Sequence, residues 1–496
     1  METFLSSLDM ITSWSVLIAL IIGSIGGVII GAIPGVGPPM AIAILLPATF
    51  AMEPIVGLTL LLGVYGSAMY GGAIPAVLMN VPGTAVNALT TYDGYPMTRS
   101  GQGARALSLC YGASFFGGIF SVVCLMAFAP VLADVAPLFG SREIFMAALL
   151  GGVLVVIAHR GHGLFSGFMF CFGMFLASIG LETSELTQRY TFGMTWLSSG
   201  VDLIVVILGI FALSQAFHLL TADDEDTIEV EKPVGVGKRL GEVARMPRAS
   251  IISSTFGVIM GVIPGVGQFI AQFFSYTIIQ KTSKNPEQFG AGAPEGIVAS
   301  EAANNAVPAA AMIPLLALGI PGEALTAMML SVFYVHNVVP GPNLFLSEFD
   351  FVMALYLCLI LINVITLIFL LVSTGFIVNV SSIPNRYLGV LTLTLCFIGI
   401  YALRNSVTDC LLAAVFGVIG LVFKRLDLPT IPIILGMVLG EIMETKFRTS
   451  MARIDHYYEF INRPISGTIF AIIVIAILTH LFFQIKYWRQ SRSTGV

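Results

Sequence analysis

The sequence predicts an all-α polytopic membrane protein built from two related halves, and three observations carry that prediction. Of its 496 residues, 57% are hydrophobic and only 10% are charged, whereas soluble domains carry about 25% charged residues. Several apolar stretches approach the roughly 20 residues that a membrane-spanning helix needs. The motif Gly31–Gly37, read GAIPGVG, returns at Gly261–Gly267 as GVIPGVG.

The apolar stretches define the expected membrane segments. They are Ser15–Ile33, Ala106–Ala129, Ile144–Ala158, Leu203–Leu220, Phe351–Val378 and Ile465–Phe483. Residues Met1–Trp14 contain no Lys or Arg, so they lack the basic start of a cleaved signal peptide and the first segment is expected to stay in the mature protein. The six cysteines lie in or beside apolar runs without metal-like spacing, which indicates neither disulfides nor a zinc site. No basic patch indicates nucleic-acid binding.

One polar stretch divides the chain. Residues 221–250 open with acids at Asp223–Asp226 and close with basic residues at Lys238–Arg248. Basic residues beside a membrane segment favour the cytoplasmic side. We therefore expect a first membrane repeat at 1–220, a cytoplasmic linker at 221–250 and a second membrane repeat at 251–496.

Two broken segments recur in the same order. Gly31–Gly37 and Gly261–Gly267 are 230 residues apart, and Ile74–Gly83 and Ile313–Gly322 are 239 apart. Proline removes a backbone donor and glycine loosens the helix. Inside a bilayer such a break is tolerated only within protein or beside a wet cavity. Paired broken helices in two halves are typical of a transporter's substrate site.

The flanking charges indicate how the halves are oriented. The helix before the first motif starts from a flank without basic residues, so we expect it to start outside. The helix before the second starts from Lys238–Arg248, so we expect it to start inside. Opposite orientation is the inverted-repeat arrangement of many secondary transporters.

The second half carries the most informative polar group. Glu301, Asn304 and Asn305 lie at i, i+3 and i+4 and share one helical face. An acid with two carboxamides suits a hard cation such as Na⁺, or a carboxyl that gains and loses a proton. The alternative is that the two asparagines join helices by hydrogen bonds. We expect a Na⁺ or proton-coupling site here and no other cofactor.

The first half has Leu62 at the position equivalent to Glu301, so the halves differ in chemistry. It offers neutral polar groups after its second break instead, and helix N-terminal amides there suit an anion. A plain kink capped by Thr84 is the alternative. For Glu323, local capping is at least as good an interpretation as ligation. The predicted substrate-site residues are Pro34, Gly35, Val36, Gly37, Asn80, Gly83, Thr84, Asn87, Pro264, Gly265, Val266, Gly267, Gln268, Pro321 and Gly322.

Six segments together resemble the large membrane subunit of the tripartite tricarboxylate transporters (TctA-type). They are Gly31–Thr49, Tyr70–Gly83, Asp93–Arg99, Gly261–Tyr276, Glu295–Asn305 and Ile313–Gly322. The resemblance implies a bacterial inner-membrane permease of about a dozen helices that moves by an elevator mechanism. It also implies a small four-helix membrane subunit and a periplasmic solute-binding protein that delivers a carboxylate.

We therefore predict a permease subunit, surrounded by membrane lipid, that imports di- or tricarboxylates such as citrate by Na⁺ or H⁺ symport, and that is not an enzyme. One alternative is a permease of the same type for another organic anion, and another is a passive anion channel. An intramembrane acid protease would need two converging acids, whereas Glu301 stands largely alone.

Overall fold

The fold is taken from a computed structural model of the chain. It describes residues 2–33, 37–135, 138, 140–158, 163–182, 187–221, 233, 235–380, 385–426, 428–454 and 456–493. The predicted site residues Pro34, Gly35 and Val36 and the linker residues 222–232 and 234 lie outside the described residues.

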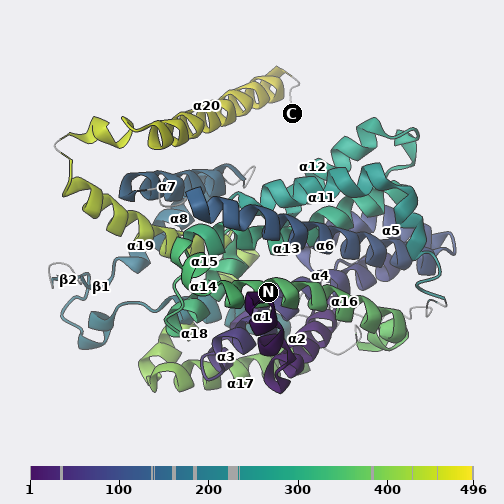
Figure 1. Cartoon of the computed structure of the whole chain (residues 1–496), viewed down its shortest axis with the longest axis horizontal. Helices are drawn as coiled ribbons and strands as arrows, with labels where there is room; N and C mark the ends of the chain where they lie inside the picture. Colours follow the sequence, from purple (N-terminus) through teal and green to yellow (C-terminus); the bar gives the residue numbers. More distant parts are fainter. Residues whose placement is uncertain are drawn as a thin grey trace. The chain divides into compact units, whose positions relative to one another are not determined.

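The described chain is mainly helical (Figure 1). Six helices are long and apolar enough to cross a membrane, by length and composition. They are Trp14–Ala32, Pro54–Met79, Gly103–Val135, Leu203–Thr221, Phe349–Val378 and Val407–Arg425. These segments agree with the membrane class expected from composition, and they include most of the predicted spans.

The chain forms two compact units, each with segments from both predicted halves. Unit 1 comprises Met1–Asp134 and Ile204–Val422, and unit 2 comprises Val135–Leu203 and Phe423–Val496. The helices that lie mainly in unit 1 are α1 (Glu2–Thr12), α2 (Trp14–Ala32), α3 (Pro38–Thr49), α4 (Pro54–Met79), α5 (Ala88–Arg99), α6 (Gly103–Val135), α9 (Leu203–Ile207), α10 (Ser214–Thr221), α11 (Pro247–Val262), α12 (Gly267–Thr282), α13 (Pro294–Leu318), α14 (Ala324–Val335), α15 (Pro342–Ser347), α16 (Phe349–Val380), α17 (Asn385–Arg404) and α18 (Val407–Arg425).

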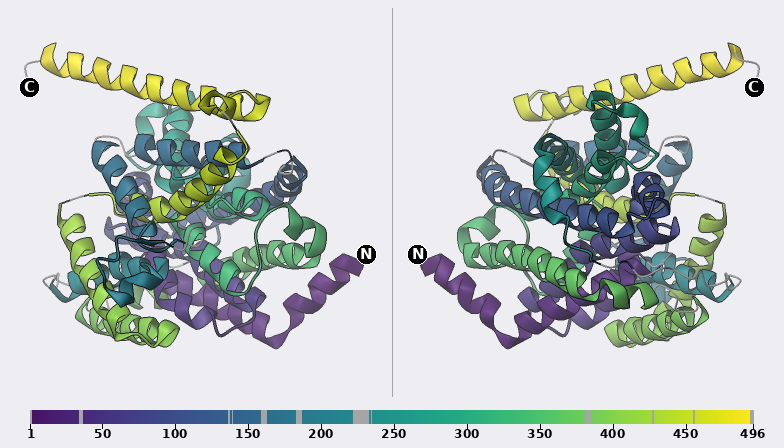
Figure 2. Two further views of the ribbon diagram at one scale, coloured as in Figure 1. Left: turned by 90° about the vertical axis from the view of Figure 1, so that its left-hand side faces the viewer. Right: turned by 90° about the vertical axis from the view of Figure 1, so that its right-hand side faces the viewer.

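Both predicted helix breaks of the GxIPGVG type are present. Helix α2 ends at Ala32 and α3 begins at Pro38, while α11 ends at Val262 and α12 begins at Gly267. In the second motif, Gly265 and Gly267 have φ angles of 78° and 72°. Side chains with a Cβ rarely adopt this left-handed conformation, which is why the turn contains glycines. Figure 2 also shows α1 and α2 meeting in a V at the chain start.

The second pair of breaks matches as well. Helix α4 ends at Met79 and is capped by Asn80 with a φ of 60°, and α13 ends at Leu318 and is capped by Gly319 with a φ of 69°. These two positions are 239 residues apart. A left-handed residue after the last turn is a common helix terminator, because it lets the following amides bond back to the helix.

The packing of the two halves repeats at equivalent glycines. A Cβ atom placed on Gly27 would lie 2.7 Å from the carbonyl oxygen of Val64, and one on Gly257 would lie 2.4 Å from that of Ala303. Glycine therefore permits the same close crossing in the pair α2–α4 and in the pair α11–α13. The orientation of the two halves across the membrane stays a prediction.

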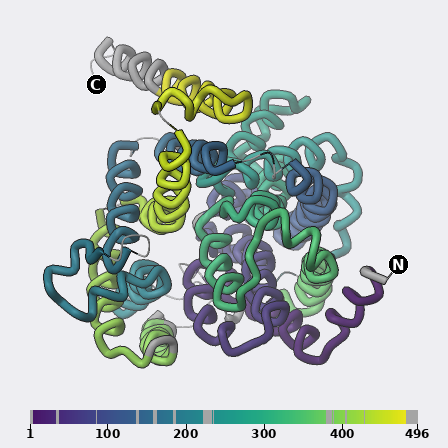
Figure 3. The backbone as a smooth tube through the Cα atoms, turned by 60° about the vertical axis from the view of Figure 1, so that its left-hand side comes forward, coloured from purple at the N-terminus to yellow at the C-terminus, as the bar shows by residue number. Residues whose placement is uncertain are grey.

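The direction of each helix follows from the order of these contacts. Gly23 of α2 approaches Leu60 of α4, and Gly31 approaches Ala68, so α2 and α4 run parallel. Similarly, α11 runs parallel to α13. Helix α12 turns back beside α11 (Figures 1 and 3), and its Ser275 hydroxyl donates to the Ala299 carbonyl of α13 at 2.8 Å. Each GxIPGVG motif thus joins two arms of a helical hairpin.

Unit 2 contains α7 (Ser141–Ala158), α8 (Gly163–Ala177), α19 (Ile431–Met451), α20 (Pro464–Ser493) and the two-residue strands β1 (Gly180–Leu181) and β2 (Gln188–Arg189). Helices α7, α8 and α19 pack together, and α20 packs on α7. The strands pair antiparallel, with Gly180 opposite Arg189.

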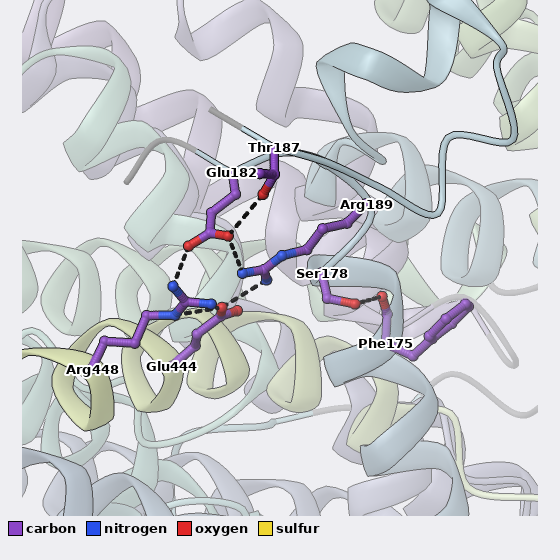
Figure 4. Close-up of polar contacts among 7 residues, drawn as sticks. All are labelled: Phe175, Ser178, Glu182, Thr187, Arg189, Glu444 and Arg448. Atoms are coloured by element: carbon purple, nitrogen blue, oxygen red, sulfur yellow. Dashed lines mark hydrogen bonds and ion pairs between the residues drawn. The ribbon is translucent and has the colours of Figure 1, made fainter. Parts of the chain in front are cut away.

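Four charged side chains attach the strand pair to α19 (Figure 4). Arg189 reaches Glu182 at 2.5 Å and Glu444 at 2.7 Å, and Arg448 forms a second ion pair with Glu182. Partial burial acts to raise the pKa of Glu182, but the guanidinium groups of Arg189 and Arg448 outweigh it and lower that pKa. The alternating charges form a network, which holds better than isolated surface pairs do.

Candidate functional site

Helix α13 carries an acid and two carboxamides that are deeply buried in unit 1. The side chains of Glu301 and Asn304 are 0% exposed, and that of Asn305 is 4% exposed. Small residues surround them along α13 and let neighbouring helices approach closely. A Cβ atom placed on Gly117 of α6 would lie 2.2 Å from the Ala302 carbonyl oxygen. The sequence thus brings an acid to a point where several helices meet.

Four neutral side chains donate hydrogen bonds to the Glu301 carboxylate. Its Oε1 accepts from the Asn87 amide at 3.2 Å and from the Thr90 hydroxyl. Its Oε2 accepts from the Ser114 hydroxyl at 3.0 Å and from the Asn305 amide at 3.4 Å. Since Asn87 and Thr90 follow the break after α4 and Ser114 belongs to α6, the first half supplies three of the four donors.

Further bonds orient these donors. The Thr84 hydroxyl donates to the side-chain Oδ1 of Asn87 at 2.6 Å, and the Asn87 Nδ2 also donates to the Met69 backbone carbonyl at 3.2 Å. Asn305 donates to the Ser114 hydroxyl oxygen at 2.8 Å. The amides therefore present their NH₂ groups toward Glu301, and each has a reason to keep that orientation.

No cationic side chain pairs with Glu301 among the described residues. A buried carboxylate without a counter-charge is costly in a protein interior and is a functional hypothesis at membrane depth. Two chemical states relieve the cost: the carboxyl binds a proton, or a cation binds beside it. No three His, Cys, Asp or Glu side chains gather as a metal-binding group within the described parts, so a cation here would rely on neutral oxygens as well.

Several buried carboxamide atoms near α13 have no hydrogen-bond partner among the described residues. These are both polar atoms of Asn304, both of Gln272 and the Asn305 oxygen. Gln272 follows Ala271, which packs on Ala303, the residue before Asn304. Buried polar groups are nearly always satisfied by protein, water or a ligand. This set therefore leaves hydrogen-bonding groups near α13 that water or a polar ligand would satisfy.

The predicted residues divide into those that meet at Glu301 and those that do not. Thr84, Asn87 and Asn305 join its network, whereas Asn80 is exposed and the Asn304 amide makes no hydrogen bond to the carboxylate. The anion site at this break stays a prediction, and the Thr84 hydroxyl bonds the Asn87 side chain.

The glycine motifs have structural contacts of their own. The Gly265 amide donates to the Gly322 carbonyl at 2.8 Å. A Cβ atom on Gly322 would lie 2.7 Å from the Gly261 carbonyl oxygen, and one on Gly83 would lie 2.3 Å from that of Gly31. The remaining predicted positions lie along the same turns. Gly37 caps α3, and Gln268 donates to the Tyr65 hydroxyl at 3.4 Å. Pro321 is buried, and the half-buried positions are Pro264, Val266 and Gly267.

Two residues that contact Glu301 are absent from the site predicted from the sequence. Thr90 and Ser114 contact Glu301, and Thr90 could have been found by its spacing of three residues from Asn87. Asp93 was noted only as part of a motif. Its Oδ1 accepts from the backbone amides of Gly290, Gly292 and Ala293 at 2.8 to 3.0 Å.

Asp93 also accepts from the Tyr276 hydroxyl through Oδ2, at 2.7 Å. It is 1% exposed and lies one helical turn after Thr90 on α5. Helix α5 thus holds the start of α13 with one side chain and contacts Glu301 with another. It connects the first half to the second at two points.

Comparison with known proteins supplies the family. The profile of the tripartite tricarboxylate transporter TctA family matches residues 17–435, which is most of the chain. The chain belongs to this family. The family resemblance expected from the sequence motifs is thereby confirmed.

Two relatives come from Agrobacterium vitis. An uncharacterized 52.8 kDa protein in the TAR-I ttuC' 3'region is 32% identical over 463 residues, which cover 92% of each chain. An uncharacterized protein in the TAR-II ttuC' 3'region is 32% identical over 236 residues, 47% of this chain and 97% of the relative. No solved structure matches. As a TctA family member the chain is a multi-pass membrane protein of a transporter family, not of an enzyme family.

Proposed function

We propose that this TctA family member is the permease subunit of a secondary transporter that imports di- or tricarboxylates, citrate among them, together with Na⁺ or H⁺. One observation carries the proposal beyond the family: the buried Glu301 carboxylate is held only by neutral donors, three of them from the other half of the chain. Such a group gains stability when a cation or proton arrives.

The coupling follows from electrostatics. An anionic substrate at membrane depth needs compensating positive charge. Helix-end amides at the two breaks supply part of it, and a cation or proton at Glu301 supplies more. Binding of either ligand then favours binding of the other, and by linkage the effect is reciprocal.

The hydroxyl groups of Thr90 and Ser114 suit this exchange. Each donates to an ionised carboxylate, and each can turn to accept instead when the carboxyl is protonated or a cation binds. The unpartnered oxygens of Asn304 and Asn305 add acceptors for a hard cation.

The family supports the rest of the proposal. We propose that the chain works in the bacterial inner membrane with a small four-helix membrane subunit and a periplasmic solute-binding protein that delivers the substrate. We also propose about a dozen membrane helices in two inverted repeats that move as an elevator. A passive anion channel is the rival, and it needs no carboxylate that binds the coupling ion.

Uptake tests the function directly. Cells that contain the chain and its two partner subunits are given labelled citrate with and without Na⁺ and with a protonophore. We expect uptake to require one of the two gradients. Glu301→Gln removes the charge but keeps the shape, so it should lower coupled uptake at least about tenfold or abolish its ion dependence.

Glu53→Gln is the matched control, because Glu53 is an exposed acid at the start of α4. It should leave uptake unchanged. Citrate uptake that survives collapse of both gradients in the wild type would favour the channel. Coupled uptake that is unchanged in Glu301→Gln would remove this carboxylate from the mechanism.

A further inference from the structure

A polar cavity lies in unit 1, with a lining that includes none of the residues of the Glu301 network. It has a volume of about 480 Å³, within the range of about 300–1,000 Å³ that is usual for small-molecule sites. Its walls come from the start of α6, from the 3₁₀ segment η5 (Leu240–Arg245) that ends the linker, and from the loop between α12 and α13.

Three arginines line this cavity. Arg105 donates through Nε to Glu242 at 2.9 Å, and Arg239 donates through Nη1 to the other oxygen of Glu242 at 3.0 Å. Partial burial acts to raise the pKa of Glu242, but these two guanidinium groups outweigh it and hold that pKa below its usual range. One carboxylate thus bridges two arginines at the cavity wall.

The third arginine leaves the cavity with an excess of positive charge. Arg245 is exposed, and no ion pair joins it to another described residue. The other acid in the lining, Glu295, already accepts from the Ser283 hydroxyl at 2.5 Å. Against three guanidinium groups there are two carboxylates, one of which is shared by two arginines. Asn285 and Gln288 also line the cavity and add neutral donors.

The loop wall belongs to the second half alone. The spacing between the halves grows from 230 residues at the first motif to 239 at the second, so nine residues are added between them. In the structure α3 and α4 are joined by Phe50–Glu53, whereas α12 and α13 are joined by Ser283–Ala293. The additional residues therefore build part of the cavity wall.

The same loop is held in place before any ligand arrives. Asp93 accepts from the amides of Gly290, Gly292 and Ala293, and Phe289 packs edge-on against Tyr276 with ring centres 5.3 Å apart. A wall fixed in this way loses little entropy on binding, which favours affinity.

We propose that this cavity binds a small anion through its carboxylate or phosphate groups, with Glu242 holding the place of one such group between Arg105 and Arg239. Arginine guanidinium groups match planar carboxylates and phosphates through paired hydrogen bonds. Because the cavity includes the basic end of the linker, it lies on the side expected to be cytoplasmic. That the ligand is the transported carboxylate rests on the proposed function, whereas the anion site does not.

Binding to the purified full chain tests the site. The chain is placed in nanodiscs of neutral phosphatidylcholine, and citrate and then inorganic phosphate are titrated by calorimetry. Arg245→Gln should weaken binding at least about tenfold, the effect of losing one charge-assisted contact. Glu242→Gln should tighten it, because the arginines are released from their internal partner.

Arg248→Gln is the matched control. Arg248 is an exposed arginine three residues further along the chain, but it donates to the Thr282 carbonyl and does not line the cavity. The citrate affinity of Arg248→Gln should stay within about twofold of the wild-type affinity. Equal effects of Arg245→Gln and Arg248→Gln would overturn the site, because they would show only a general charge effect.

A lipid headgroup carries the same phosphate chemistry, and a second arm separates it from a soluble anion. The citrate titration is repeated in nanodiscs that contain phosphatidylglycerol. If the lipid weakens citrate binding to the wild type but not to Arg245→Gln, the cavity is assigned to the lipid phosphate. Unchanged citrate affinity assigns it to the soluble anion. The uptake assay in cells tests the transport function separately from this site. If coupled uptake is found but Arg245→Gln leaves binding unchanged, the anion site alone is overturned. If no uptake is found but the expected binding changes are, the transport function alone is overturned.

Discussion

At the scale of single residues, two buried carboxylates of unit 1 are satisfied in different ways. Three backbone amides and a phenol surround Asp93, and backbone amides cannot turn into acceptors. Glu301 is surrounded by side-chain hydroxyls and amides, and the hydroxyls can reverse their roles. Asp93 therefore suits a fixed joint, whereas Glu301 suits a group that changes its protonation or cation occupancy.

Asp93→Ala tests the joint. The substitution leaves three amides and the Tyr276 hydroxyl without their acceptor, and unsatisfied buried donors cost about 1–3 kcal/mol each. We expect the protein in detergent to lose at least about 3 kcal/mol and to unfold at least about 5 °C lower in thermal melts. Asp9→Ala, at an exposed acid of α1, should leave the melting temperature unchanged. A similar small shift in both variants would contradict the role of Asp93.

Residue chemistry explains which site residues the sequence could supply. Glu301 and Asn87 were predicted, because an acid and an amide beside helix breaks in an apolar chain are unusual. Thr90 and Ser114 were not, because hydroxyl residues are common in membrane helices and often bond their own backbone. Only the folded chain shows which of them turn toward the acid.

At the scale of helices, glycine sets the distance between the two members of each repeated pair. Gly27→Ala should prevent the close crossing of α2 and α4, because its Cβ would lie 2.1 Å from the Ser67 hydroxyl oxygen and 2.7 Å from the Val64 carbonyl. We expect a loss of several kcal/mol, since the Ser67 hydroxyl can turn away but the contact with the Val64 backbone requires the helices to move apart. Thermal melts and folded yield in detergent measure it.

Gly26→Ala is the control one position earlier, where an added Cβ meets nothing within 4 Å. It should be neutral, or stabilising by up to about 1 kcal/mol through helix propensity. Equal stability of the two variants would show that the crossing is not set by close packing.

The strand pair of unit 2 should respond to acid. The folded-state pKa of Glu182 is lowered, so its stabilising effect is complete above the unfolded value of about 4.3. The effect is lost as pH falls through the lower folded-state value. After correction for intrinsic rates, hydrogen exchange of residues 187–199 should show protection at about pH 6.5 that falls by about pH 3.5.

Two variants separate this effect from general acid unfolding. Glu182→Gln should show weaker protection than the wild type at about pH 6.5 and little change with acid, because its ion pairs with Arg189 and Arg448 are absent at both pH values. Glu441→Gln, at an exposed acid of the same helix α19 as Glu444, should behave like the wild type. Protection that persists in acid in the wild type would mean that the ion pairs do not hold the strands.

Helix breaks could be predicted from the sequence because proline and glycine act locally. The motifs at Gly31–Gly37 and Gly261–Gly267 indicated where helices end, and the helices do end there. Contacts between the halves could not be predicted, since the pairing of Asn87 with Glu301 joins residues 214 positions apart. Neither a local sequence pattern nor the composition of either segment predicts a contact between residues so far apart in the chain.

At the scale of the whole molecule, the two halves share packing but not chemistry. The glycine crossings are equivalent, yet Leu62 and Tyr65 of α4 stand where α13 has Glu301 and Asn304. Glu301, the acid of the proposed coupling site, and the loop of the arginine-lined cavity both lie in the second half. Two halves with the same helix packing thus carry different polar groups. This difference suits a transporter that takes up a ligand at one surface and releases it at the other.

The orientation of the repeats decides whether those surfaces are opposite sides of the membrane. Because α2 and α4 run parallel, the loop that contains Ala51 lies on the side where α2 starts. By the same reasoning, the loop that contains Lys284 lies on the side where α11 starts. Both positions are exposed, and they occupy equivalent loops of the two halves. Inverted repeats place them on opposite sides, and parallel repeats place them on the same side.

Single cysteines distinguish the two arrangements. In a background without the six native cysteines, Ala51→Cys should react with a membrane-impermeant maleimide added to intact spheroplasts, because the first helix starts from a flank free of basic residues. Lys284→Cys should react only after the membrane is opened, because its loop lies beside the basic end of the linker. Labelling of both cysteines in intact spheroplasts, or of neither, would contradict the inverted arrangement. It would also place the arginine-lined cavity on the side of the membrane where α2 starts.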